Sequence, residues 1–304
     1  MKVIFVAPKT NLPEKLIKKL KQQADVYFFE DNPIDIRNIK MLKEKGDKIL
    51  CPFPEPMAWK FPSEFIEEIP DLKAICVSTT SFSWIDGKLA RSLNIHLTNV
   101  PNPPNVAAES AIFSMFAVAK KYAVTLKDKK FDYQPSNFLL EVTNKTMGVV
   151  GLGKIGSRIA DLGKRLDMNV IYWSRKTRNN KYKYVELEEL FKTADFIFTS
   201  TVLNDETKKL VSPKLIDLMK PTSSIIANIN GEVVDMDYLL KKVKEKKIYG
   251  CALSSEKTIR DFEGNVFPIY INNWYTKETV EQKMKIWIDS IISVIKGKPI
   301  NLVN

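Results

Sequence analysis

Short apolar runs alternate with stretches of helical periodicity along the first hundred residues of the chain. The apolar runs predict β-strands at residues 3–6, 25–29, 48–52, 74–77 and 94–97. The periodic segments between them predict helices at residues 13–22, 65–69 and 87–93. Strands that alternate with helices form a parallel sheet covered on both faces, so this part of the chain predicts an α/β domain.

A proline cluster separates this region from a second alternating series. Pro101, Pro103 and Pro104 are unsuited to a helix interior or a central strand, which predicts a connector. Beyond it we expect an apolar helix, a long series of strands and helices, and a closing helix that returns to the first domain, at residues 107–121, 147–275 and 281–295. The sequence thus predicts two doubly wound α/β domains, formed by residues 1–100 with 285–304 and by residues 101–284.

The composition is that of an ordinary folded protein. Of the 304 residues, 44% are apolar and 27% are charged, and no apolar run reaches the ~18 residues that a membrane span needs. The first apolar run ends at Pro8, so it predicts a strand rather than a secretory signal, and we expect a cytoplasmic protein without membrane contact. Three widely separated cysteines predict neither a disulfide framework nor a metal site.

The net charge of +11 comes from lysine, because only 7 of the 47 cationic residues are arginine. The lysines are interspersed with acids, and the sequence contains no recognisable nucleic-acid-binding module. This pattern predicts a solvated surface rather than a nucleic-acid partner, and it also suits an anionic substrate or cofactor. The one histidine, His96, falls in a predicted strand and is expected to be structural.

Three glycines follow an apolar strand and open an amphipathic helix. Gly151, Gly153 and Gly156 have the spacing of a dinucleotide-binding loop, with Lys154 and Ile155 between the last two. In such a loop the first glycine permits a tight turn, the second lets a pyrophosphate approach the backbone, and the third lets the helix pack closely. A helix N-terminus then attracts phosphate. The alternative interpretation is a tight turn without a ligand.

The next predicted strand, at residues 169–173, ends in a basic segment. An NAD site usually places an acid here to bind the ribose 2′-hydroxyl, whereas this chain has Ser174, Arg175, Lys176 and Arg178. A hydroxyl and guanidinium groups can bind a 2′-phosphate, which a carboxylate would repel. The segment therefore predicts a preference for NADP(H) over NAD(H), and the alternative is a solvated basic loop.

Several segments resemble blocks of one enzyme family, in order along nearly the whole chain. They are NVP at 99–101, GLGKIG at 151–156, YWSR at 172–175, LNDET at 203–207, GEVVD at 231–235 and WYTKE at 274–278. The chain resembles the D-isomer-specific 2-hydroxyacid dehydrogenases, and its cofactor loop is similar to that of the NADP-using glyoxylate and hydroxypyruvate reductases. The resemblance implies a flavodoxin-like substrate domain and a Rossmann dinucleotide-binding domain, with a cleft between them.

The same resemblance implies a reaction and a quaternary structure. The family transfers a hydride between a nicotinamide and a 2-oxo acid, so we expect a small anionic 2-oxo acid or a related compound as the substrate. Within this pattern, the segment at 203–207 is expected to flank the nicotinamide. The resemblance further implies a twofold dimer through the cofactor domain, with the apolar helix at 107–121 in the interface.

The catalytic residues of the family are replaced at the matching positions. The substrate-binding arginine corresponds to Asn230, and the proton-transferring histidine corresponds to Ile271. The glutamate that supports the histidine falls near Ile259, where Glu256 or Glu263 could take its place. Isoleucine has no proton to transfer, and general acid catalysis contributes roughly 10²–10⁴-fold. Asparagine has no charge with which to clamp a carboxylate.

Two hypotheses follow from these replacements. The first is an oxidoreductase with a rebuilt site, in which Tyr270 donates the proton among other polar residues, Asn230, Asn272, Asn273 and Tyr275. The second is a non-catalytic relative that binds the dinucleotide and acts as a sensor or an interaction partner. The substrate-side turn has changed as well, because Thr79, Thr80 and Ser81 stand where the family has a glycine-containing turn, and their hydroxyls could bind an anion.

Overall fold

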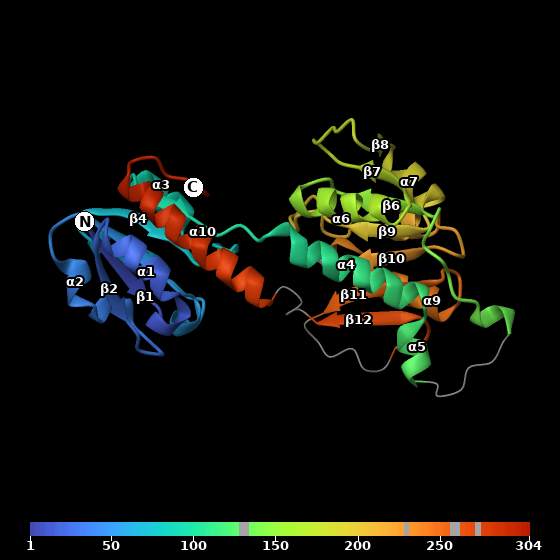
Figure 1. Cartoon of the computed structure of the whole chain (residues 1–304), viewed down its shortest axis with the longest axis horizontal. Helices are drawn as coiled ribbons and strands as arrows, with labels where there is room; N and C mark the ends of the chain where they lie inside the picture. The colour runs from blue at the N-terminus through green and yellow to red at the C-terminus, as the bar shows by residue number, and fades with distance from the viewer. Residues whose placement is uncertain (128–133, 228–230, 256–261, 271–274) are drawn as a thin grey trace. The chain divides into compact units, whose positions relative to one another are not determined.

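The computed structural model describes residues 1–127, 134–227, 231–255, 262–270 and 275–304. They form two compact units, Met1–Pro103 with Thr276–Asn304 and Pro104–Tyr275. Each unit contains one parallel sheet with helices on its faces (Figure 1). The described residues confirm the α/β architecture with two parallel sheets that the alternating pattern predicted.

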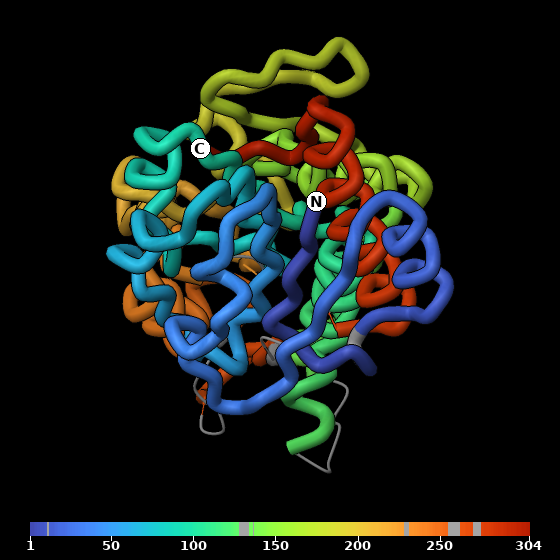
Figure 2. Tube along the Cα trace, turned by 90° about the vertical axis from the view of Figure 1, so that its left-hand side faces the viewer, coloured from blue at the N-terminus to red at the C-terminus, as the bar shows by residue number. Residues whose placement is uncertain are grey.

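The first unit is built on a five-stranded sheet in the order β2-β1-β3-β4-β5, and both chain termini lie in this unit (Figure 2). Its strands are β1 (Lys2–Val6), β2 (Asp25–Phe29), β3 (Lys48–Pro52), β4 (Leu72–Cys76) and β5 (His96–Thr98). Its helices are α1 (Glu14–Lys21), α2 (Lys40–Lys43), α3 (Gly87–Ser92) and α10 (Lys277–Ile295), with 3-10 helices at Lys9–Asn11, Ile36–Asn38, Glu55–Met57 and Ser63–Glu68. The helix expected at 65–69 is therefore a 3-10 helix.

The two faces of this sheet bury separate apolar cores. α1 and α10 cover one face, and α2, α3 and the 3-10 helix Ser63–Glu68 cover the other. The fully buried Trp287 of α10 donates from Nε1 to the carbonyl oxygen of Cys76 over 2.7 Å. Because α10 is one continuous helix packed on this sheet, the unit boundary lies between Tyr275 and Thr276 rather than at the expected residue 284.

The second unit is built on a seven-stranded sheet in the order β12-β11-β10-β9-β6-β7-β8. Its strands are β6 (Thr146–Val150), β7 (Asn169–Trp173), β8 (Lys183–Tyr184), β9 (Phe196–Thr199), β10 (Ser224–Ala227), β11 (Gly250–Ser255) and β12 (Val266–Tyr270). Its helices are α4 (Pro104–Ala119), α5 (Tyr122–Lys127), α6 (Lys154–Arg165), α7 (Leu187–Thr193), α8 (Pro213–Ile216) and α9 (Met236–Lys244), with 3-10 helices at Pro135–Asn137 and Gly231–Val233. β6 lies between β7 and β9, so the strand order reverses at β6, which is where doubly wound sheets bind ligands.

α4 begins at Pro104, inside the proline cluster that the sequence predicted to be only a connector. Proline is tolerated in the first turn of a helix, because the N–H that proline lacks would have no intrahelical partner there. The helix packs on α6 and on the β10–β12 side of the sheet, and it buries Ala108, Met115 and Val118 in the core of the unit. Most of the apolar character of α4 is therefore used inside its own unit.

The three cysteines are buried thiols on β3, β4 and β11. Burial raises the pKa of the Cys51 and Cys251 thiols, which disfavours the thiolate form that reacts and binds metals. Among the described residues, no cluster of side chains has the makeup of a metal site. None of the helices in the described ranges combines the length and apolar character that a membrane crossing requires.

Candidate functional site

Two glycines shape the turn between β6 and α6. Gly151 has a φ of +98°, a left-handed conformation that favours glycine, and its N–H donates to the carbonyl oxygen of Trp173 over 2.8 Å. A Cβ added at Gly156 would lie 2.0 Å from the carbonyl oxygen of Gly151. Only glycine at position 156 therefore lets the first turn of α6 approach the carboxyl end of β6 this closely.

The start of α6 is open at Gly153. This residue is exposed, and a Cβ added there would meet nothing within 4 Å. No side chain of the described residues caps the helix, whose first turn contains Lys154 and no acid. Ile155 packs against the apolar core beneath the helix. The exposed N–H groups and the positive end of the helix dipole make this turn suitable for a phosphate group.

A pocket of about 510 Å³ lies beside this turn. Gly151 and Gly153 line it, together with the end of β7 and the segment after β9. Of the four polar residues expected around a 2′-phosphate, Ser174, Arg175 and Lys176 line this pocket. Its volume lies in the range of about 300–1,000 Å³ that is typical of small-molecule sites.

Arg178, the fourth predicted residue, is absent from the lining of this pocket. Its guanidinium lies 3.9 Å from the ring centroid of Tyr184, and its Nη1 donates to the carbonyl oxygen of Ser174 over 2.7 Å. The stacking and the hydrogen bond hold the backbone at Ser174, whose side-chain oxygen accepts from the N–H of Thr177 over 3.4 Å. In this structure Arg178 therefore supports the backbone of the basic segment from outside the pocket.

An acid on α6 anchors the chain just beyond the basic segment. The carboxylate of Asp161 accepts hydrogen bonds from Nζ of Lys181 and from the hydroxyl of Tyr182. The hydrogen bond from Lys181, followed by that from Tyr182, lowers the pKa of Asp161, so this carboxyl group stays ionised at neutral pH. The segment after β7 is thus attached at both ends, and Arg175 lies between the attachments.

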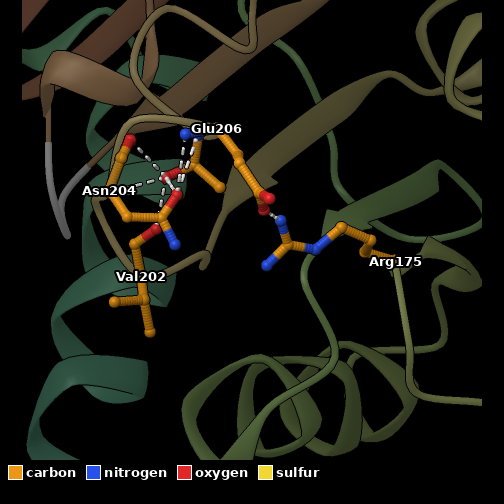
Figure 3. A network of polar contacts seen from close by, with 5 residues as sticks. Arg175, Val202, Asn204 and Glu206 are labelled. Atoms are coloured by element: carbon orange, nitrogen blue, oxygen red, sulfur yellow. Dashed lines mark hydrogen bonds and ion pairs between the residues drawn. The ribbon is translucent and has the colours of Figure 1, made fainter.

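Glu206 is a pocket residue that the sequence did not identify individually. Its carboxylate forms an ion pair with the guanidinium of Arg175, and Figure 3 shows the two side chains pointing toward each other. The segment at 203–207, which was expected to flank the nicotinamide, thus meets the end of β7, and Asn204, Glu206 and Thr207 line the same pocket as Arg175. An ion pair between two loops has no sequence signal of its own.

The predicted substrate-side turn follows β4 in the first unit. The Thr79 hydroxyl donates to the carbonyl oxygen of Ser81, and the Thr80 hydroxyl donates to that of Val100, each over 2.7 Å. Both hydroxyl hydrogens are therefore used to hold the turn together. The Ser81 hydroxyl lies 3.4 Å from that of Ser83, so the Thr79 and Ser81 hydroxyls contact other residues of the turn, whereas the Thr80 hydroxyl ties the turn to Val100.

Most of the predicted catalytic positions lie outside the described residues. These positions are Asn230, Glu256, Ile259, Ile271, Asn272 and Asn273. Tyr270 is the last residue of β12, and its backbone pairs with that of Ser255 at the end of β11. Because all strands of this sheet are parallel, Tyr270 belongs to the carboxyl edge, the same edge that carries the glycine turn.

The candidate Glu263 and the single histidine, His96, lie at the amino edges of their sheets. Glu263 precedes β12, and its carboxylate pairs with Lys244 of α9 over 3.0 Å. It therefore belongs to the amino edge of the sheet, away from the glycine turn, which argues against Glu263 as the residue that takes the place of the family's glutamate. His96 is the exposed first residue of β5 and belongs to the amino edge of the sheet in the first unit.

Comparison with known proteins identifies related chains over most of the length. Residues 110–257 match the family model described as "D-isomer specific 2-hydroxyacid dehydrogenase, NAD binding domain". A Staphylococcus saprophyticus protein that carries the name of a 2-hydroxyacid dehydrogenase is 31% identical over 266 residues, which cover 83% of this chain and 81% of that protein. A glyoxylate reductase of Thermococcus litoralis is 28% identical over 317 residues, covering 97% of this chain and 95% of the reductase.

A solved structure of similar fold contains a bound dinucleotide. It is an acyclic imino acid reductase, Bsp5, in complex with NADPH and D-Arg, which is 27% identical with a TM-score of 0.79 and full coverage of both chains. These proteins carry the names of reductases and a dehydrogenase, so they lend no support to the non-catalytic alternative. An NAD-binding domain and an NADPH complex together support a nicotinamide dinucleotide without distinguishing its two forms.

Replacing each of two glycines by alanine separates the fold of the turn from its binding role. We expect Gly153→Ala to leave the thermal stability unchanged, because its Cβ meets open space, and to weaken dinucleotide binding at least about tenfold by obstructing the phosphates. Gly156→Ala should lower the stability by about 1–3 kcal/mol or more, because its Cβ overlaps backbone. Thermal unfolding and fluorescence titration measure both effects, and full-affinity binding by Gly153→Ala would show that no phosphate approaches there.

Proposed function

The chain belongs to the D-isomer specific 2-hydroxyacid dehydrogenase family, and we propose that it transfers a hydride between a nicotinamide dinucleotide and a small 2-oxo or 2-hydroxy acid or a related carbonyl compound. The observation that carries this proposal is the glycine turn at the start of α6, which opens onto a pocket lined by cationic residues. The three buried thiols suit a reducing compartment, and we place the protein in the cytoplasm.

We propose NADP(H) as the preferred dinucleotide. In the NAD sites of this fold, an acid at the end of the second strand binds the ribose 2′-hydroxyl. Here β7 ends at Trp173, and the next three residues are Ser174, Arg175 and Lys176, all of which line the pocket. A planar guanidinium can bind phosphate oxygens through two parallel hydrogen bonds, and the serine hydroxyl can add another.

The chain's own residues have distinct tasks in this proposal. The N–H groups at the start of α6 bind the pyrophosphate, and Ser174 with Arg175 binds the 2′-phosphate. When bound, NADPH supplies the hydride. The Asn230 amide donates a hydrogen bond to the substrate, and the Tyr270 hydroxyl donates the proton to the oxygen that becomes negative as the carbonyl carbon accepts the hydride. Ile271 takes no part in proton transfer.

We also propose a homodimer through the second unit. Much of α4 packs in its own core, but Phe113 keeps 61% of its surface exposed. Further exposed apolar side chains lie near the end of this helix. The N–H of Leu140 donates to the carbonyl oxygen of Ala119, the last residue of α4, over 2.9 Å, and this hydrogen bond brings the segment before Leu140 to the helix end. The exposed side chains are Tyr122, Leu126, Phe138 and Leu139. Clustered exposed apolar side chains of this kind are typical of a protein interface.

Substitution of Arg175 tests the cofactor preference. We expect Arg175→Ala to weaken NADPH binding about 10–100-fold, because a hydrogen bond to a charged group contributes roughly 1.5–3 kcal/mol. NADH, which has no 2′-phosphate, should lose at most about threefold. Fluorescence titration with both dinucleotides measures the two constants. Equal losses for the two dinucleotides would show that the basic segment is merely solvated.

Turnover of simple 2-oxo acids tests the assignment of the catalytic positions. With NADPH, we expect glyoxylate, hydroxypyruvate and pyruvate to be reduced more slowly than about 1 s⁻¹, the lower end for ordinary enzymes. Asn230→Arg or Ile271→His alone should recover little, because such residues act as a unit. Both together with Ile259→Glu should raise the rate at least about 10²-fold. Fast turnover by the unmodified chain would contradict the assignment of Asn230 and Ile271, and Tyr270→Phe would then show whether the Tyr270 hydroxyl supplies the proton.

Light scattering at micromolar concentration tests the dimer. We expect twice the mass of one chain, because exposed apolar side chains near the end of α4 would be buried between two copies. Phe138→Glu should shift the mass toward one chain by placing a charge in the interface. The matched control is Ile300→Glu, which changes a side chain of the first unit that is 48% exposed and should remain dimeric. A monomeric unmodified protein would contradict the proposal.

A further inference from the structure

An acid and a base meet across the pocket where the adenosine end of a dinucleotide would bind. Arg175 follows β7 and Glu206 follows β9, which are the two strands on either side of β6. Their ion pair joins the two loops, and both residues line the pocket that contains Gly151 and Gly153 (Figure 3). The pair therefore lies at the place where the basic segment would contact a 2′-phosphate.

Hydrogen bonds within its own loop hold Glu206 in place. The side-chain oxygen of Asn204 accepts from the N–H groups of Glu206 and Thr207, each over 3.1 Å. The Thr207 hydroxyl donates to the carbonyl oxygen of Val202 over 2.5 Å, and it accepts from the N–H of Asn204 over 2.8 Å (Figure 3). The loop thus presents its carboxylate toward Arg175 from a fixed backbone, whereas the Arg175 side chain is long and can turn.

We propose that Glu206 is a cofactor-selectivity residue, which holds Arg175 in the unliganded pocket and is replaced as its partner by the 2′-phosphate of NADP(H). This inference rests on the proposed dinucleotide-binding function. A carboxylate and a phosphate compete for one guanidinium, and the carboxylate also repels the phosphate. NAD(H) carries a hydroxyl at this position, which does not compete with Glu206 for the guanidinium. Glu206 therefore reduces the ratio of NADP(H) to NAD(H) affinity that Arg175 creates.

The exposure of the pair limits the size of this effect. The side chains of Arg175 and Glu206 are 47% and 71% exposed, so water and salt weaken their attraction. We expect Glu206→Gln to raise the ratio of NADPH to NADH affinity by about two- to fivefold, which matches the range of exposed ion pairs. The increase should shrink as the salt concentration rises, because the interaction is screened.

Titrations of four variants with NADPH and NADH provide the test. Asp205→Asn is the matched control, because it removes one negative charge from the same loop at a residue that does not line the pocket. It should change the affinity ratio by less than half as much as Glu206→Gln. The variants Arg175→Ala and Arg175→Ala/Glu206→Gln complete a double-mutant cycle, in which the effect of Glu206→Gln should largely disappear once Arg175 is absent.

The outcomes distinguish this inference from the function on which it rests. If the unmodified protein binds both dinucleotides and Glu206→Gln leaves the affinity ratio unchanged or lowers it, the role of Glu206 is contradicted, whereas the proposed dinucleotide binding is not. An equal increase of the affinity ratio in Asp205→Asn, or an effect of Glu206→Gln that persists without Arg175, would show that Glu206 acts only through its negative charge in the loop. Either result also contradicts the proposed role of Glu206. If the unmodified protein binds neither dinucleotide, the proposed function fails and this inference fails with it.

Discussion

The close contact between Gly156, which has no Cβ, and the carbonyl oxygen of Gly151 determines where this molecule can bind an anion. A Cβ there would lie 2.0 Å from the carbonyl oxygen of Gly151, so any other residue would push α6 away from the turn after β6. With glycine in place, the helix begins at the carboxyl edge of the sheet, between the loops that follow β7 and β9. Those loops carry Arg175 and Glu206, so the charges that the pocket presents are aligned with the turn only because of this close contact.

The residues that would bind the dinucleotide and those at the proposed catalytic positions differ in their chemistry. The glycine turn and the open helix start are the parts that a dinucleotide requires, and the described residues contain both, together with the basic segment that we propose binds a 2′-phosphate. In the proposed assignment the family's arginine corresponds to the uncharged Asn230, and its histidine corresponds to Ile271, which has no proton to give. Under the proposed assignment we expect the chain to bind the dinucleotide without fast reduction of simple 2-oxo acids, since binding and transition-state stabilisation depend on different residues.

The sequence predicted those features that depend on local pattern. β2 and β3 have the predicted bounds. All residues of β3 are buried, and a strand buried on both faces appears as a short apolar run, whereas β2 is a partly exposed edge strand with an apolar run of its own. The helix start at Pro104 was missed, because a proline cluster indicates a loop more readily than a first helical turn. The Arg175–Glu206 pair could not be predicted, since the strand order of the sheet brings the two loops together. The same holds for Glu263, whose sheet edge is a property of the fold.

A competition experiment tests the central claim that the pocket beside the glycine turn binds the adenosine end of NADP(H). Bound NADPH would be displaced, as monitored by its fluorescence, with adenosine 2′,5′-bisphosphate and with adenosine 5′-monophosphate, which differ only in the 2′-phosphate. Because Ser174 and Arg175 line the pocket, we expect the bisphosphate to compete at least about tenfold better, as one charge-assisted contact predicts. Equal competition by the two nucleotides, or none by either, would contradict the account.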